Sequence, residues 1–328
     1  MLDSARHYQS PADIERFIDW MALHKLNVLH WHLTDDQAWR LEIRRYPRLT
    51  EVGAWRVPAG AAARTDIDQA TGQPRLYGGY YSQDTVRRLA RYAAARNVTI
   101  VPEIEMPGHA TAALVAYPEL AAGEVPAAVP ADWGIYPNLF DVDETTFAFL
   151  EHVLVEVIEL FPSAYVHIGG DEVVKDQWRT SARTQRWMRE RGISDVDELH
   201  GHFIARIGRF LSSRGRRLVG WDEILEEALP PEATAAARHG VGGLAHAVFR
   251  QPPGDGCGGA SRARTADRAR GCLRVRPDHC GTDASRTATR ARFAGEHLDG
   301  AHPHGRARGL DGYSTGGCGG GARLVTAG

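Results

Sequence analysis

Amphipathic stretches and short apolar runs alternate along the first 234 residues of the chain. The first amphipathic stretch follows Ser10-Pro11, a pair that favours the start of a helix. Its apolar positions recur at helical spacing: Ile14, Phe17, Ile18 and Met21. Stretches with the same spacing lie within residues 84–97, 147–161 and 196–213. Each of the four is predicted to be a helix that buries one face.

Short runs rich in Val, Ile, Leu, Trp and Tyr are typical of strands buried in a parallel sheet. Such runs occupy residues 27–33, 98–101, 164–168 and 217–221, and residues 1–6 are interpreted as a strand that has already begun. The alternation predicts an α/β fold, and polar strand ends favour a (β/α)8 TIM-type barrel. The barrel is incomplete, because only about five βα units are recognisable. Residues 56–83 and 118–143 have little periodicity and are predicted to be long loops.

The segment 167–172 (His-Ile-Gly-Gly-Asp-Glu) carries the clearest chemistry. Two glycines free the backbone after a strand, and the neighbouring acids Asp171 and Glu172 follow at the edge where β/α enzymes place catalytic groups. Repulsion and partial burial favour one protonated acid beside an ionised partner, as general-acid catalysis requires. Acids also favour the first turn of a helix. The preceding strand and the two glycines favour the catalytic interpretation.

The strand over residues 27–33 also ends in polar residues. His30 and His32 are followed by residues 34–37 (Thr-Asp-Asp-Gln). Two histidines at a period of two, followed by two acids, are compatible with a metal site. The flanking Trp31 and Trp39 favour a sugar pocket instead, because pyranose rings stack on aromatic faces.

The third and fifth strands end in further candidate residues. Residues 102–109 (Pro-Glu-Ile-Glu-Met-Pro-Gly-His) place His109 beside two glutamates at a strand end, which favours a functional role over a structural one. The run 217–221 leads into Trp221-Asp222-Glu223.

Composition excludes several classes of protein. A net charge of -2 and an apolar fraction of 43% indicate a full core and no nucleic-acid or membrane partner. No stretch approaches the roughly 20 apolar residues of a membrane span. Residues 1–6 do not resemble a signal peptide, which leaves open a cytoplasmic location or secretion with a lost leader.

The last quarter of the chain differs in character from the rest. The last tryptophan is Trp221 and the last isoleucine is Ile224. All four cysteines come later, with spacings that match neither a zinc site nor a compact disulfide framework: Cys257, Cys272, Cys280 and Cys318. We therefore expect a partial catalytic barrel over residues 1–234 and an off-pattern tail, disordered or frame-shifted, over residues 235–328.

Five segments together resemble the glycoside hydrolase family 20 β-N-acetylhexosaminidases, and they occur in the family's order: residues 1–8, 26–39, 101–109, 167–172 and 220–223. The resemblance implies an exo-acting glycosidase. Its substrates would be oligosaccharides or glycoconjugates with a terminal β-linked N-acetylglucosamine or N-acetylgalactosamine, such as chitin or peptidoglycan fragments.

The resemblance also implies a role for each strand end. Glu172 matches the general acid/base, and Asp171 matches the carboxylate that orients and stabilises the substrate's 2-acetamido group. Arg6 matches the arginine that holds hydroxyls of the terminal sugar, a bidentate task suited to guanidinium. Three more positions match residues that organise the pocket, support the acid or wall the acetamido group: Asp35, His109 and Trp221.

The implied reaction is substrate-assisted. The acetamido oxygen attacks the anomeric carbon, and water opens the resulting oxazolinium ion with retention of configuration. No metal or organic cofactor is implied. Two alternatives stay open: an inactive carbohydrate-binding remnant that keeps the sugar contacts of Arg6, Asp35 and Trp221, and a barrel glycosidase that uses two carboxylates directly.

The chain departs from the family at both ends. The family usually carries a small α+β domain before the barrel, whereas this chain begins in the first barrel strand. After residue 234 it lacks the tryptophan-bearing strands that would complete the barrel. An open five-stranded piece exposes a sheet edge, and activity far below the family's level is expected because the pocket lacks walls.

We hypothesise that residues 235–328 are a frame-shifted translation of GC-rich DNA. Lysine is scarce throughout, with two residues against 37 arginines, and the tail loses Trp and Ile while it gains every cysteine. A disordered basic linker is the alternative. Reading the nucleotide sequence in the other two frames is expected to yield tryptophan-bearing βα segments, and their absence from both frames would disprove the hypothesis.

Overall fold

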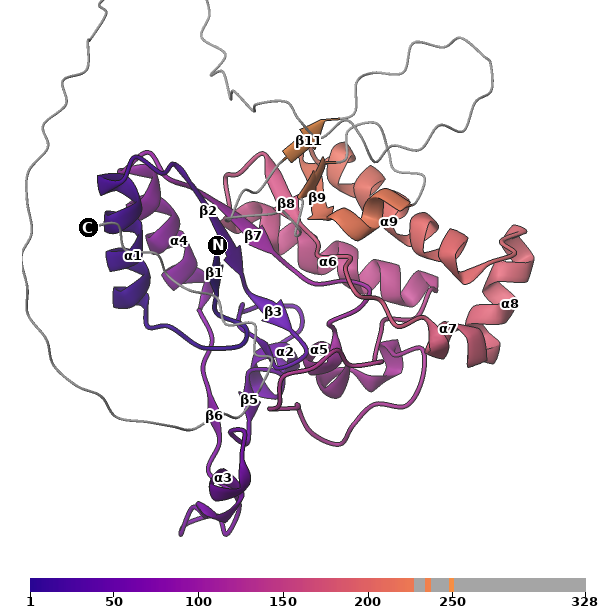
Figure 1. Cartoon of the computed structure of the whole chain (residues 1–328), viewed down its shortest axis with the longest axis horizontal. Coiled ribbons are helices and arrows are strands. Elements are labelled where there is room, and N and C mark those ends of the chain that lie inside the picture. Colours follow the sequence, from indigo (N-terminus) through magenta and orange to yellow (C-terminus); the bar gives the residue numbers. More distant parts are fainter. Residues whose placement is uncertain (227–233, 237–247, 251–328) are drawn as a thin grey trace, which may run out of the picture. The chain divides into compact units, whose positions relative to one another are not determined.

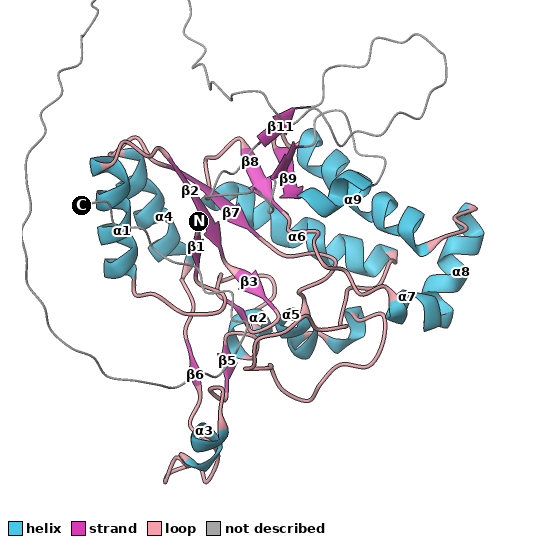
Figure 2. Cartoon of the chain, in the orientation of Figure 1, coloured by secondary structure: helices cyan, strands magenta, loops and turns pink. Residues whose placement is uncertain are grey.

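A computed structural model of the chain describes residues 1–226, 234–236 and 248–250. A seven-stranded sheet lies at its centre, in the order β1-β2-β7-β8-β9-β10-β11 (Figures 1 and 2). All neighbours are parallel except β10 and β11. The strands are β1 (Leu2–Asp3), β2 (Val28–His32), β7 (Thr99–Glu103), β8 (Tyr165–His167), β9 (Arg217–Trp221), β10 (Thr234–Ala236) and β11 (Val248–Arg250).

Four long helices connect the parallel strands, and all four were predicted: α1 (Pro11–Leu23), α4 (Gln83–Ala94), α6 (Glu144–Leu160) and α9 (Val196–Ser213). Each begins after a residue whose side chain accepts a hydrogen bond from the first turn: Ser10, Ser82, Asp143 and Asp195. Such caps satisfy backbone N–H groups that lack a partner within the helix. The apolar stripe of each helix is buried.

The two faces of the sheet differ in polarity because successive side chains of a strand point to opposite sides. In β2, Leu29 and Trp31 belong to the apolar core that the helices cover, and the Trp31 ring lies 6.2 Å from that of Phe161. His30 and His32 alternate with them and lie on the other face, where they meet Glu103 of β7. The sheet therefore has an apolar face toward the helices and a polar face that is nevertheless buried.

The segment predicted as a long loop over residues 56–83 contains regular structure. β5 (Trp55–Arg56) and β6 (Tyr77–Gly78) pair antiparallel and, with α3 (Ala61–Thr65) between them, form an arm that projects from the sheet (Figure 1). Two-residue strands are too short to give a periodic signal, which explains why the prediction was wrong here. A second small hairpin, β3 (Thr34–Asp35) with β4 (Ala38–Trp39), follows β2 directly.

Shorter helices were not predicted. They are α2 (Arg48–Glu51), α5 (Thr111–Ala116), α7 (Asp176–Thr180), α8 (Ala182–Arg191) and the 3-10 turns η1 (Pro118–Leu120) and η2 (Asp222–Glu226). In α8 the only buried positions are Thr184, Trp187 and Met188, so the sequence has no apolar stripe to reveal it. No helix in the described part of the chain is long and apolar enough to cross a membrane.

The fold is α/β with a parallel sheet, as predicted. Closure into a barrel remains a prediction, because among the described residues β1 pairs on one side only. The predicted division at residues 234 and 235 falls at β10 and also remains a prediction. Most of the proposed tail, residues 237–247 and 251–328, lies outside the described residues.

The two faces of β2 predict contrasting effects of truncation. Leu29→Ala removes a fully buried side chain between sheet and helices, and we expect it to lower the free energy of unfolding by about 2–5 kcal/mol. Val28→Ala, on the same strand but 54% exposed, is expected to change it by less than about 0.5 kcal/mol. Urea unfolding measures both, and equal effects would contradict this assignment of faces.

Candidate active site

Polar side chains converge where the parallel strands end. Five neighbouring strands contribute, either from their last residues or from the segment that follows: Asp3 and Arg6 from β1, Asp35 and Asp36 from the β3–β4 hairpin after β2, Glu103, Glu105 and His109 from β7, Asp171 and Glu172 from β8, and Trp221 from β9. Most of these side chains are buried, and Glu172 is 34% exposed. This edge of the sheet is where β/α enzymes place their active sites.

Two left-handed glycines place the neighbouring acids. Gly169 has φ +70° and Gly170 has φ +87°, and a Cβ at Gly169 would lie 1.6 Å from Oε2 of Glu105. Glu172 itself has φ 50°, an unfavourable conformation for a residue with a side chain. The bend leaves Asp171 buried and Glu172 partly open to solvent. Strain of this kind concentrates at functional sites.

His109 bridges two pairs of acids. Its Nδ1 lies 3.0 Å from Oδ2 of Asp36 and 3.3 Å from Oδ1 of Asp35, while its Nε2 lies 3.4 Å from Oε2 of Glu172 and 3.9 Å from Oδ2 of Asp171. Burial alone would lower the pKa of His109, but hydrogen bonds to Asp35 and Asp36 outweigh it and raise that pKa to about 12. His109 is therefore a cation beside the catalytic candidates at neutral pH.

Asp35 connects this histidine to Arg6. Its Oδ2 lies 2.6 Å from Nη2 of Arg6 and 3.3 Å from Nε2 of His32. Burial would raise the pKa of Asp35, but the hydrogen bond from His109 and the charges of His32 and Arg6 lower it below its usual value. Arg6 also pairs with Asp3 at 3.1 Å, so two carboxylates fix its guanidinium.

Two buried arginines that the sequence analysis missed hold the loop after β1. Arg40 is fully buried and donates to the carbonyl oxygens of Ser4 at 2.9 Å and Ala5 at 3.1 Å. Arg56 donates to the carbonyl oxygen of Arg6. Burial lowers the pKa of Arg40 to about 10. Nothing in the local sequence distinguishes these arginines from the many exposed ones.

Glu103 and Glu105 were noted in the sequence without an assigned role. Their pKa values shift in opposite directions. Oxygens of Glu103 lie 2.8 Å from Nε2 of His30 and 2.9 Å from Nδ1 of His167. Burial would raise the pKa of Glu103, but the surrounding histidines hold it well below its usual range. For Glu105, burial and the charge of Asp171 both raise the pKa well above its usual range. Their period-two spacing at the end of a strand was the one signal for their shared face.

Trp221 packs against two histidines of the polar face. Its ring centroid is 4.9 Å from that of His167 and 5.6 Å from that of His30, and its side chain is 6% exposed. The structure thus brings Arg6, Asp35, His109 and the acid pair into one network, with Trp221 beside the histidines. The role of Trp221 as a wall of an acetamido pocket stays a prediction.

Several groups in the described part of the chain have the spacing to hold a cation. One is His30 with Glu103 and His167, whose donor atoms lie within 4.8 Å of one another. Its nitrogen-to-oxygen distances of 2.8 and 2.9 Å are those of charge-assisted hydrogen bonds. We therefore interpret this group as two histidines that contact the buried Glu103 carboxylate.

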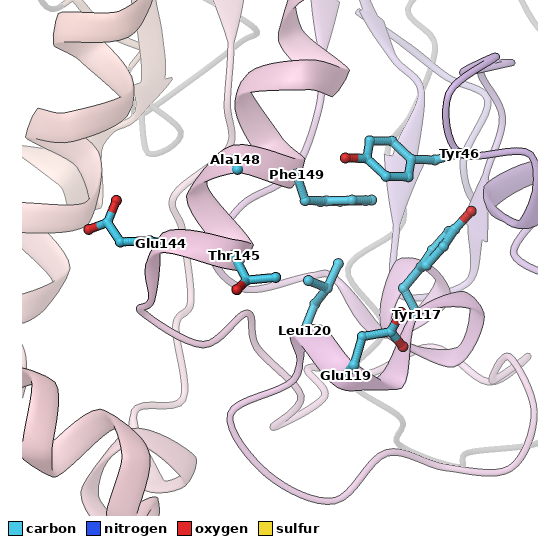
Figure 3. Close-up of a pocket in the computed structure, with 8 residues that line it drawn as sticks. All are labelled: Tyr46, Tyr117, Glu119, Leu120, Glu144, Thr145, Ala148 and Phe149. Atoms are coloured by element: carbon cyan, nitrogen blue, oxygen red, sulfur yellow. The ribbon is translucent and has the colours of Figure 1, made fainter.

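A surface groove of about 520 Å³ lies apart from this network, because none of its lining residues belongs to it (Figure 3). Tyr46, Tyr117 and Phe149 form its aromatic wall. The hydroxyl of Tyr46 lies 2.9 Å from Nδ1 of His152, and that of Tyr117 accepts a hydrogen bond from the backbone N–H of Arg48. These hydroxyls already have partners within the protein.

Comparisons with known proteins identify the relatives of this chain. The catalytic domain of glycosyl hydrolase family 20 matches residues 1–241. A β-hexosaminidase of Porphyromonas gingivalis is 45% identical over 249 residues, which are 75% of this chain and 30% of that protein. A β-hexosaminidase of Vibrio furnissii is 40% identical over 225 residues, 68% of this chain and 36% of that protein.

Solved structures give the same result. A β-N-acetylhexosaminidase of Bacteroides fragilis superimposes with a TM-score of 0.62 at 38% identity, covering 72% of this chain and 44% of that chain. An exo-β-N-acetylglucosaminidase of Vibrio harveyi, in complex with N-acetylglucosamine, gives 0.60 at 37% identity, covering 72% and 37%. This parallel α/β chain with its acid pair belongs to glycosyl hydrolase family 20. It spans less than half the length of each of these relatives.

The close packing around Gly169 predicts that an alanine there costs more stability than an alanine at Gly72, another glycine with a left-handed backbone. Gly169→Ala places a methyl group against the buried carboxyl of Glu105, whereas Gly72→Ala, at φ +67°, meets open space. Both variants carry backbone strain, so their difference isolates the steric clash. We expect Gly169→Ala to lower the free energy of unfolding by about 1–3 kcal/mol more than Gly72→Ala. Equal losses in urea unfolding would show that the Glu105 carboxyl moves away freely.

Proposed function

We propose that this chain acts as an exo-β-N-acetylhexosaminidase by substrate-assisted hydrolysis. The observation that carries the proposal is the pair of adjacent acids on the bent loop after β8, with His109 in contact with both. Membership in the family supports the reaction class. The activity is a proposal because the chain spans only part of its relatives.

The spacing of the two acids supports the acetamido group as the nucleophile. Oxygens of Asp171 and Glu172 lie within 4.8 Å of each other, and both acids come from one loop. Two-carboxylate glycosidases place their acids on opposite sides of the bond, about 5–5.5 Å apart for retention and about 6.5–9.5 Å apart for inversion. Neighbouring residues of one turn do not flank a sugar in this way. This pair therefore supports the substrate's own acetamido group as the nucleophile.

The partly exposed Glu172 is assigned the proton transfers. It donates its proton to the glycosidic oxygen as the bond to the anomeric carbon breaks, and the acetamido oxygen attacks that carbon to form an oxazolinium ion. The ionised carboxylate of Glu172 then removes a proton from water, which attacks the same carbon and reopens the ring. Two inversions at the anomeric carbon give net retention.

The buried Asp171 is assigned to the acetamido group. Its carboxylate accepts a hydrogen bond from the acetamido N–H, which gains positive charge as the ring forms. A preorganised anion stabilises that charge more in a site without water than in solvent. His109 lies between Asp171 and Glu172 and the anions Asp35 and Asp36, so it holds both acids in place.

Arg6 is assigned to the hydroxyls of the terminal sugar. Asp35 and Asp3 fix one side of its guanidinium, while 28% of its side chain remains exposed. The planar fork of guanidinium suits adjacent sugar hydroxyls. Relatives support the substrate class, since one solved structure holds N-acetylglucosamine and another is a chitobiase of Flavobacterium johnsoniae. We infer oligosaccharides with a terminal β-linked N-acetylhexosamine.

Hydrolysis of a chromogenic β-N-acetylglucosaminide tests the proposal. Glu172→Gln removes the proton donor while keeping the shape, and we expect kcat/KM to fall by about 10²–10⁴-fold. Glu190→Gln, at an exposed position of α8, serves as the matched control and should leave kcat/KM unchanged. Turnover that survives Glu172→Gln would contradict the assignment.

A chain without turnover would favour the alternative of a carbohydrate-binding remnant. Calorimetry with N-acetylglucosamine then separates the two outcomes. Binding without hydrolysis identifies the remnant, whereas neither binding nor hydrolysis by folded protein rejects both forms of the proposal.

A further inference from the structure

His32 faces four carboxyl groups at once. Its Nδ1 lies 3.6 Å from Oδ1 of Asp3 and 3.8 Å from Oε2 of Glu103, and its Nε2 lies 3.3 Å from Oδ2 of Asp35 and 3.4 Å from Oε1 of Glu105. The side chain is 3% exposed. These acids come from the ends of β1, β3 and β7 and from the loop after β7, so four carboxyl groups from different segments meet at one imidazole.

The placement of the acids determines the charge of the ring. A neutral imidazole has one N–H and one lone pair, so one of its two nitrogens would direct a lone pair toward carboxyl oxygens. At His32 both nitrogens face acids, at 3.6 and 3.8 Å from Nδ1 and at 3.3 and 3.4 Å from Nε2, and this arrangement favours a ring protonated at both nitrogens. Burial alone would lower the pKa of His32, but the charge of Glu103 and the contact with Glu105 raise it to about 10.

His30, two residues earlier on the same strand, is a natural comparison. It is also buried, at 7% exposed, but among the acids it contacts Glu103, with its Nε2 at 2.8 Å. Burial outweighs the charge of Glu103 and lowers the pKa of His30 to about 4, helped by the neighbouring His167 and His32. Two histidines on one face of one strand therefore differ in pKa: the acids around His32 outweigh its burial, whereas Glu103 does not outweigh the burial of His30.

We propose that His32 is a positioning residue of the active site, a buried imidazolium that joins Glu103 to Asp35 and keeps the Asp35 carboxylate ionised and aimed at Arg6 and His109. The inference rests on the proposed function and extends it. His32 is not assigned a contact with the sugar; it controls the charge of Asp35, which organises the pocket. Asp35 contacts Arg6, His32 and His109, and both histidine side chains are 3% exposed.

Loss of this cation changes the response of the site to pH. Burial raises the pKa of Asp35, and three neighbouring cations lower it. Without His32 only two cations oppose the effect of burial, so the pKa of Asp35 rises. Asp35 is then protonated at a higher pH as the solution is acidified, and Arg6 and His109 lose their shared anion. The remaining acid neighbours of the ring, Asp3 and the two glutamates, cannot replace a cation.

Nitrogen NMR of the full chain with ¹⁵N-labelled histidine tests the charge directly and needs no activity. We expect both ring nitrogens of His32 to remain protonated at pH 8, while His30 is neutral. The His32 signals are identified by their loss in His32→Gln, or by through-bond assignment if that variant does not fold. A neutral His32 ring at pH 8 would overturn the inference, even in an active enzyme.

The pH profile tests the positioning role. In His32→Gln we expect the acidic limb of the pH profile of kcat/KM for the chromogenic substrate to shift to higher pH by about one unit. His30→Gln, equally buried on the same strand, should leave the limb in place, which separates a charge effect from general damage to the core. An unmoved limb in His32→Gln would refute the positioning role. A charged His32 in a chain that neither binds nor hydrolyses the sugar would reject the proposed function and leave the charge assignment intact.

Discussion

The carboxylate of Asp35 is the interaction on which the polar side of this fold depends. One of its oxygens meets Arg6 and His32, and the other meets His109, so residues from three strand ends share a single buried anion. Burying such a charge is costly unless it is paired. Removing Asp35 would take from three cations the one anion that they share, and Glu172 would lose part of the support that reaches it through His109.

The backbone makes this network possible. Alternation along β2 directs Trp31 into the helix-covered core and His32 into the polar face. Left-handed turns at Gly169 and Gly170 then bring the acids of the next loop into reach of His109. The apolar face stabilises the sheet, and the polar face uses that rigidity to hold charges at fixed distances, which is the condition for electrostatic preorganisation.

Sequence reasoning reached the elements whose signals are local. Ser10 and the apolar stripe behind it identified α1, and the run 217–221 identified β9 over its full length. The acid pair stood out because glycines and a strand precede it. Arg40, Arg56 and the charge of His32 were not predictable, since burial and partners are set by residues distant in the chain. The arm at β5 and β6 escaped detection because its strands are too short to have a period.

Substrate assistance is the central claim, and the dependence of hydrolysis on the 2-acetamido group tests it most directly. The measurement compares kcat/KM for p-nitrophenyl β-N-acetylglucosaminide with that for p-nitrophenyl β-glucoside, which has a hydroxyl at the same carbon. We predict hydrolysis of the first and a rate for the second at least about 10³-fold lower, because the glucoside has no internal nucleophile. Comparable rates would contradict the account and indicate that a carboxylate of the protein attacks the sugar.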